Sequence, residues 1–151
     1  MEYDTPPGRS YRYYTGQPLF PFGSGLSLTT FTHSCTCAKL TLQQDDSDIS
    51  CSCTVHNTGT VAGDEVLMVY DSLSAGIRSK IGKAHPVPLK RLVEFERVTV
   101  AAGKSAPVPF KIPKKALSIT TADGSKMLYS GSHALVFSRG NGADVTIEVT
   151  V

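Results

Sequence analysis

The amino-acid sequence predicts an all-β fold, an antiparallel β-sandwich. No window of about ten residues places apolar side chains at the i, i+3, i+4, i+7 spacing of an amphipathic helix. Alternation of apolar and polar residues recurs instead along most of the chain. Clusters of Gly, Asn, Asp and Ser separate the alternating segments, and about seven short strands spaced in this way are typical of two packed antiparallel sheets.

The clearest strand begins at Ile49, where Ile49, Cys51, Cys53 and Val55 alternate with polar residues. This pattern indicates one face in the core and one face in water. Alternation predicts the other strands at 39–42, 65–70, 93–100, 108–112, 133–137 and 145–151. Turn residues predict connections at 43–48, 57–64, 101–104, 122–125 and 139–144. The segment 77–88 is predicted to be a long loop without a strand.

The first 29 residues differ from the rest, so the chain divides into an arm (1–29) and a sandwich (30–151). The arm is rich in Pro, Gly and Tyr, lacks alternation and is predicted to be extended. It has too many aromatic residues to leave in water without an apolar patch. Packing on this same domain and binding to a partner both remain open. In the second case the candidate docking residues are Tyr11, Arg12, Tyr13, Tyr14, Phe20 and Phe22.

Composition excludes several classes of protein. The chain is 40% hydrophobic and 19% charged, with a formal net charge of +2, which is ordinary for a soluble domain. Lys and Arg are scattered, so no nucleic-acid partner is predicted. The longest apolar run, Val66 to Tyr70, is far shorter than a membrane span. The first residues contain no signal peptide, so a secreted parent would carry its signal upstream.

Four cysteines form two Cys-x-Cys pairs, and a hairpin turn at 43–48 places Cys35 opposite Cys53 and Cys37 opposite Cys51. Reduced thiols, buried or at the surface, are the expected state, with disulfides and then a metal site as alternatives. Zinc sites favour Cys-x-x-Cys spacing, which this chain lacks.

The two cysteine pairs are expected to point in opposite directions. Leu40 and Leu42 alternate out of phase with the first pair. The first pair is therefore expected to face away from the core and the second pair into it.

No group of residues predicts catalysis, a metal site or a cofactor. Glycoside hydrolysis requires two carboxyl groups across a cleft, but the nearest cluster, Asp45, Asp46 and Asp48, lies in a turn and lacks the pattern of a calcium loop. The histidines have no ligand-like spacing; they are His33, His56, His85 and His133.

Three stretches resemble one protein family. They are PGRSYRYYTGQPLFPFGSGLSLTTF (7–31), VHNTGTVAGDEVLMVY (55–70) and LKRLVEFERVTVAAGKSAPVPFKI (89–112), and GSHALVF (131–137) is similar too. They resemble the C-terminal domain of family 3 glycoside hydrolases of the β-xylosidase and β-glucosidase type. The resemblance implies a fibronectin type III-like sandwich. The family's catalytic Asp and Glu lie in a barrel and an α/β domain that are absent here.

The motif residues have structural roles in this interpretation. Asn57, Gly59 and Gly63 are expected to allow positive φ between two strands, with Val55 and Val66 anchored in the core. Phe95 is expected to face the core and Glu96 to face solvent. Glu94 stands where the family usually has Gly, which is expected to change an exposed edge.

The resemblance implies a non-catalytic accessory module docked on the catalytic domains of a glycosidase, whose full-length form would be secreted. One alternative is a stand-alone interaction subunit of a larger assembly that binds another protein through the arm. A weak carbohydrate-binding module is a second alternative, although the chain has no Trp to stack on sugars.

Overall fold

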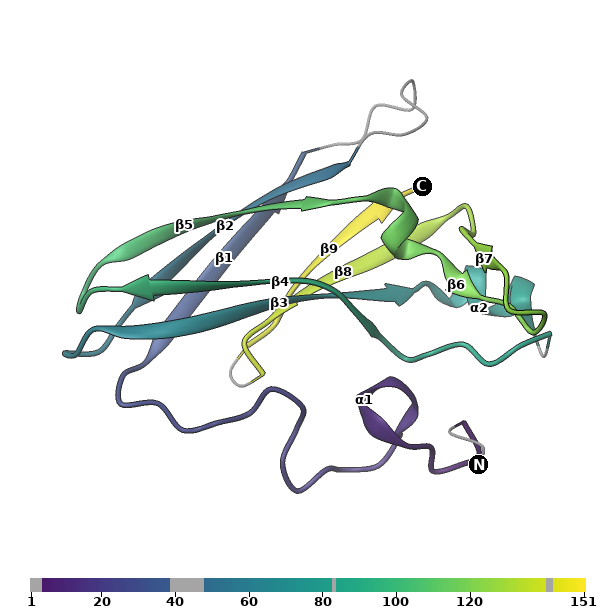
Figure 1. Ribbon diagram of the computed structural model, residues 1–151, viewed down its shortest axis with the longest axis horizontal. Helices are drawn as coiled ribbons and strands as arrows, with labels where there is room; N and C mark the ends of the chain where they lie inside the picture. The colour runs from purple at the N-terminus through teal and green to yellow at the C-terminus, as the bar shows by residue number, and fades with distance from the viewer. Residues whose placement is uncertain (1–3, 39–47, 83, 141–142) are drawn as a thin grey trace.

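Two β-sheets pack face to face in the computed structural model, which describes residues 4–38, 48–82, 84–140 and 143–151 (Figure 1). One sheet has the strand order β1-β2-β5 and the other β4-β3-β8-β9, and all paired neighbours are antiparallel. The predicted all-β sandwich is confirmed. The strand expected at 39–42 and most of the turn at 43–48 lie outside the described residues.

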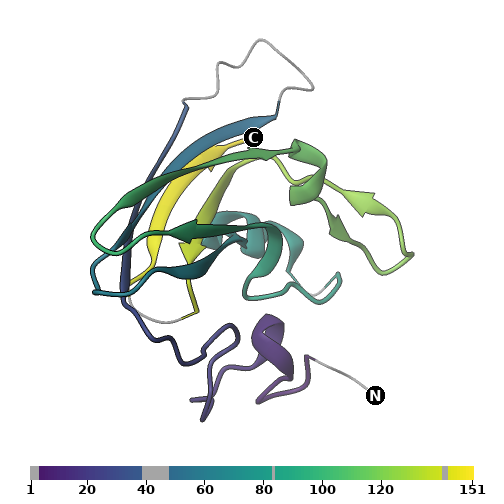
Figure 2. The same ribbon diagram turned by 60° about the vertical axis from the view of Figure 1, so that its left-hand side comes forward.

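The three-stranded sheet is built from β1, β2 and β5, and the four-stranded sheet from β4, β3, β8 and β9. The bounds of the first sheet are β1 Phe31–Cys37, β2 Ile49–Asn57 and β5 Ser105–Ile112. Those of the second are β3 Gly63–Leu73, β4 Arg91–Val100, β8 Ser132–Ser138 and β9 Val145–Thr150. Figure 2 shows both sheets from another side, with a small hairpin of β6 (Ile119–Thr120) and β7 (Lys126–Met127) beyond their ends.

The core fills the space between the two sheets, because each strand alternates inward and outward side chains. Val55 on β2 and Leu67 on β3 are completely buried there. In β2 the apolar side therefore faces inward, as expected from its alternation. The buried members of this core are Phe31, Ile49, Cys51, Cys53, Val55, Leu67, Val69, Val100, Val108, Phe110, Ile112, Leu117, Leu135, Phe137 and Val149.

Phe95 does not face the core, and this expectation was wrong. Tyr70 pairs with Leu92 and Val69 pairs with Glu94, so Val93 is an extra residue in β4. A β-bulge of this kind reverses which side chains point inward beyond it. Phe95 is consequently 58% exposed on the outer face of the sheet.

The same bulge places two carboxylates on the inner side of an edge strand. Glu96 is opposite Leu67, and Glu94 is opposite Val69, both of which belong to the core. Directly opposite residues share a face of the sheet, so Glu94 and Glu96 point toward the inner side. Because β4 is an edge strand, they lie at the open margin of the sandwich, beside β5. Charges that point inward on an edge strand oppose pairing with another chain.

The predicted loop at 77–88 begins inside a helix instead. Helix α2 (Ala75–Ile81) starts after Ser74, whose side chain accepts a hydrogen bond from the Ile77 amide at 3.3 Å. Ile77 and Ile81 lie one turn apart and are both buried in a second small core beside Leu73. One apolar pair in seven residues is too short a repeat to stand out from the sequence.

Truncating Val55 should destabilise the fold more than truncating Phe95. Val55→Ala leaves a cavity in the core and should lower the free energy of unfolding by about 1–3 kcal/mol. Phe95→Ala removes an exposed ring and should cost less than about 1 kcal/mol. Urea denaturation of both variants measures the difference, and a larger loss at Phe95 would show that the strand register beyond the bulge is wrong.

Candidate docking interface

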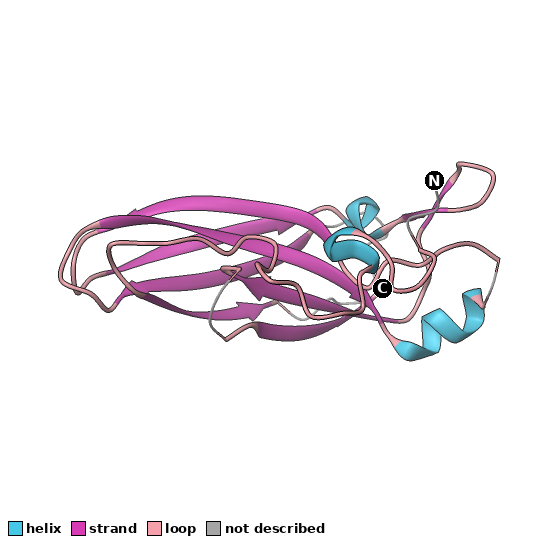
Figure 3. Cartoon of the chain, turned by 90° about the horizontal axis from the view of Figure 1, so that it is seen from below, coloured by secondary structure: helices cyan, strands magenta, loops and turns pink. Residues whose placement is uncertain are grey.

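The arm lies across the outer face of the four-stranded sheet, on the side away from the core (Figures 1 and 3). Tyr11 attaches it there. Its ring meets Tyr70 of β3 edge-on with centroids 5.7 Å apart, and its hydroxyl accepts a hydrogen bond from the Leu92 amide at 3.3 Å. Phe22, further along the arm, stacks on Tyr11 with centroids 4.5 Å apart. These contacts hold the arm on its own domain.

The middle of β3 is buried on both faces because the arm covers the outer one. Leu67 and Val69 point into the core, whereas Met68 and Tyr70 point outward and yet are 7% and 1% exposed. A Cβ added at Gly23, where φ is +84°, would lie 2.4 Å from the Met68 methyl carbon. Close contact between arm and sheet thus depends on Gly at this position.

Asn57 anchors the end of the arm where it enters β1. Its side-chain oxygen accepts hydrogen bonds from the Thr29 hydroxyl at 2.6 Å and the Gly59 amide at 3.0 Å. Its amide nitrogen donates to the carbonyls of Val61 at 2.8 Å and Val100 at 2.9 Å. Asn57 is fully buried, so these four bonds satisfy a side chain that would otherwise be costly to bury.

The glycines of the NTGTVAGDE motif serve close packing, which corrects the expectation of positive φ. Positive φ is found at neither Gly59 nor Gly63, nor at Asn57. A Cβ at Gly59 would instead lie 2.2 Å from the Thr29 hydroxyl oxygen, and one at Gly63 2.8 Å from the Thr29 methyl. Val66 is only half-buried and does not anchor the core.

The arm carries several large apolar side chains that are exposed to solvent. Phe20 is 80% exposed and Phe22 51% exposed. Phe95, on the outer face of the neighbouring β4 strand, adds a third exposed ring. We use the name arm patch for the exposed large apolar residues of the arm together with Phe95; they are Leu19, Phe20, Phe22, Leu26, Leu28 and Phe95.

The six candidate docking residues do not act alike. Tyr11 faces the sheet, Tyr13 is half-buried, and Tyr14 is 36% exposed. The carbonyl of Arg12 accepts a hydrogen bond from the Leu89 amide at 2.6 Å, while its side chain is exposed. The arm is also not fully extended, because α1 (Ser10–Tyr13) makes one helical turn.

Sequence reasoning missed three leucines of the arm patch, Leu19, Leu26 and Leu28. In the sequence of the arm, the aromatic residues are the signal of an interface, and the leucines add none. The three leucines are 87%, 107% and 93% exposed. The arm has no alternation of apolar and polar residues from which this exposure could be predicted.

A cavity of about 690 Å³ lies between the arm and the sheet. Tyr11, Tyr14, Phe20 and Phe22 contribute rings to its lining, and Lys90 and Asp144 also border it. The pKa of the nearby Tyr70 is raised to about 12. Burial is the largest cause, followed by Tyr11 and the charge of Asp144. The Tyr70 phenol therefore stays protonated and donates a hydrogen bond to the Met68 sulfur at 3.2 Å.

A buried ionic network lies on the inner face of the four-stranded sheet, beyond the end of the core. The two ring nitrogens of His133 lie 2.9 Å from an Asp71 carboxylate oxygen and 2.9 Å from the Tyr129 carbonyl. Both partners are acceptors, so both nitrogens donate and the ring is an imidazolium. Arg91 donates to the other Asp71 oxygen at 2.9 Å.

The charge on His133 follows from competing effects. Burial lowers the pKa of His133, but the hydrogen bonds to Asp71 and Tyr129 and the Asp71 charge outweigh burial and the repulsion from Arg91. The pKa is therefore raised above the ordinary value of 6.5. The charged groups of this network satisfy one another inside the fold.

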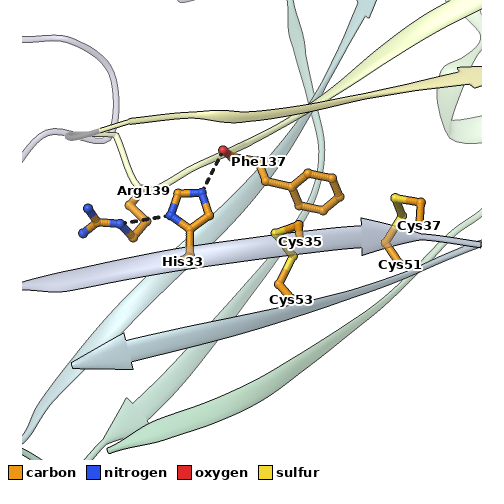
Figure 4. The surroundings of a disulfide bond; sticks show 7 residues. All are labelled: His33, Cys35, Cys37, Cys51, Cys53, Phe137 and Arg139. Carbon is orange, nitrogen blue, oxygen red and sulfur yellow. Dashed lines mark hydrogen bonds between the residues drawn. A yellow bond between two sulfur atoms is a disulfide. The ribbon is translucent and has the colours of Figure 1, made fainter. Parts of the chain in front are cut away.

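Two disulfides join β1 to β2, Cys35 to Cys53 and Cys37 to Cys51 (Figure 4). The expected opposition of these residues is confirmed by the strand register, but the expected reduced state is not found. Cys35 and Cys37 also pack against the core, contrary to the expectation that they face away. Directly opposite residues share a face, so both pairs point the same way.

Other candidate chemistry is not assembled in the part of the chain that the structure describes. There, no three His, Cys, Asp or Glu side chains form a group that could hold a metal. Asp48 is exposed just before β2, while Asp45 and Asp46 lie outside the described residues. His33 donates to the Phe137 carbonyl at 3.1 Å and accepts from Arg139 at 3.3 Å (Figure 4). No described helix has the length and apolar character needed to cross a membrane.

The fold and its disposition of strands define a class, the fibronectin type III-like domains, and residues 65–139 match that domain family. The chain is 34% identical to a β-xylosidase from Formosa agariphila over 93% of its own length and 19% of that protein. It is 37% identical to a xylan 1,4-β-xylosidase from Xylanibacter ruminicola over 80% of its length and 13% of that protein.

A solved β-glucosidase from Erythrobacter marinus superposes with a TM-score of 0.73 at 26% identity, over 98% of this chain and 19% of that one. The chain thus spans about a fifth of the length of the relatives it matches. It belongs to the fibronectin type III-like C-terminal domains of family 3 glycoside hydrolases. The catalytic domains of that family are not part of it.

Removing the disulfides should show that they form nested loops. Replacing one pair, as in Cys35→Ser/Cys53→Ser, should lower the free energy of unfolding by about 2 kcal/mol, because the other bond still closes the hairpin. Replacing all four should lower it by about 5 kcal/mol, which is about 1 kcal/mol more than the two separate losses together, since no cross-link then restricts the unfolded chain.

Denaturation in guanidinium measures these losses. The matched control is Thr36→Ser/Ser52→Ala, a pair opposed on the exposed face between the two bonds. Costs of the two separate pairs that summed to the full loss would contradict the nested arrangement.

Stability should fall as pH rises through the raised pKa of His133. A histidine whose pKa is higher in the folded state contributes stability that is complete below about 6.5, the unfolded pKa, and is lost above the folded value. The free energy of unfolding, measured in urea at pH values from 5.5 to about 9, should decline across that interval.

His133→Gln should flatten this decline, while the control His56→Gln, on the outer face of β2, should keep it. The prediction is wrong if the unmodified chain and His133→Gln share the same pH profile.

Proposed function

We propose that this chain is a non-catalytic accessory module that docks on the catalytic domains of a β-xylosidase or β-glucosidase through the arm patch. One observation carries the proposal: Tyr11 and Gly23 hold the arm on its own sheet, and the arm nevertheless leaves large apolar residues exposed to solvent. Phe20 is 80% exposed and Leu26 is 107% exposed in this domain. Apolar patches of this kind mark protein interfaces.

The relatives supply a suitable partner. They are β-xylosidases and β-glucosidases in which the matched region is a fifth or less of the chain, so most of each protein lies outside it. The arm patch would then be buried within one polypeptide, as part of an interdomain interface. Its role is to hold the sandwich in place, and no reacting group is required of it.

The disulfides support an extracellular setting for such an enzyme. Cross-links of this type persist in oxidising compartments and are rare in the cytosol. With both bonds packed against the core, we infer that the module folds where thiols are oxidised.

A binding experiment in trans tests the docking role. The chain is mixed with the catalytic portion of a family 3 β-xylosidase from which the C-terminal domain has been removed, and complex formation is measured by sedimentation. Phe20→Ser/Leu26→Ser should weaken the complex at least about tenfold, because interface energy concentrates in a few large apolar side chains. The free energy of unfolding of the chain itself should change by less than about 0.5 kcal/mol, since both residues are exposed.

The matched control is Val61→Ser/Leu128→Ser, which alters two exposed apolar residues outside the arm patch. This variant should bind like the unmodified chain. Equal loss in both variants would contradict a specific role for the arm patch, and failure of the unmodified chain to bind would overturn the docking proposal.

A further inference from the structure

The cavity between the arm and the sheet combines aromatic walls with two charges. Its volume of about 690 Å³ is within the range of sites that enclose a small molecule or a large side chain. Tyr14, Phe20 and Phe22 line it from the arm. Lys90, just before β4, and Asp144, just before β9, line it from the sheet. Such a site fits a ring that carries a polar group.

The two charges act on one buried ring and do not pair with each other. The Lys90 ammonium nitrogen lies 4.5 Å from the centroid of Tyr70, and the Asp144 charge acts on the Tyr70 phenol. Within the described ranges, no ion pair includes Lys90 or Asp144. Covering the cavity with apolar surface alone would remove both charges from water without a partner, which is costly.

We propose that the cavity is the socket for a tyrosine side chain of the catalytic portion, an inference that rests on the docking role proposed above. A phenol ring can stack on Phe20, Phe22 and Tyr14. Its hydroxyl both accepts and donates, so it can take a hydrogen bond from Lys90 and give one to Asp144.

Other aromatic side chains fit less well. A phenylalanine would leave both charges unpaired, and the indole of a tryptophan can donate to Asp144 but cannot accept from Lys90. The socket thus selects among ring-bearing residues by hydrogen bonding.

Side-chain analogues test the socket on the chain as it is. The ¹⁵N-labelled protein is titrated by NMR with p-cresol, which is the tyrosine side chain, and with toluene, which is that of phenylalanine. p-Cresol should shift the amides of Ser138, Gly140 and Asp144 and bind about tenfold more tightly than toluene, because hydrogen bonds to charged groups are the stronger ones.

Two substitutions separate the polar contribution from the ring. Lys90→Met and Asp144→Asn should each reduce the preference for p-cresol over toluene by at least about threefold while leaving toluene binding in place. Lys104→Met, in the exposed turn between β4 and β5, is the matched control and should keep the full preference.

The outcomes distinguish the socket from the docking role. Binding of the catalytic portion without any p-cresol binding would overturn the socket and leave docking intact, whereas p-cresol binding without the complex would overturn docking. Equal binding of p-cresol and toluene would contradict the role of the two charges. Xylobiose shifting the same amides as strongly as p-cresol would show a carbohydrate site instead and would also overturn the socket.

Discussion

Burial of β3 on both of its faces is the constraint on which the rest of this structure depends. The inner face joins the core through Leu67 and Val69, and the outer face is covered by the arm through Tyr11 and Gly23. A strand in an antiparallel sheet with one solvated face needs only one apolar side. This strand has two, so the arm is part of the fold.

The two ends of the arm are held by different means. Near its start, the Tyr11 hydroxyl accepts a hydrogen bond from Leu92 at the beginning of β4, and the Arg12 carbonyl accepts one from Leu89 in the segment that leads into this strand. At its end, Thr29 bonds to buried Asn57, and the following strand β1 is cross-linked to β2 by Cys35–Cys53 and its neighbouring disulfide. The exposed residues between these ends are therefore presented on a fixed support. Such preorganisation would lower the entropy cost of the docking that we propose.

Polar groups restrict this sandwich as firmly as its apolar core does. Asp71 binds the His133 imidazolium and Arg91 at once, which ties β3, β8 and β4 together at the inner face. Further along β4, Glu94 and Glu96 keep the free edge of this strand charged. The first arrangement is fully hydrogen-bonded, as a buried ionic group must be to persist, and the second discourages pairing with another chain.

The sequence by itself determined the class of fold, most strands, and the opposition of Cys35 to Cys53 and Cys37 to Cys51, because alternation and turn residues act between neighbours in the chain. Tertiary structure alone decided the rest. Phe95 is exposed because one extra residue in β4 shifts the pleat, and a bulge leaves no local signature. Likewise, which face of the arm is buried depends on where Tyr70 and Met68 lie in space, a contact between segments about fifty residues apart that no periodicity encodes.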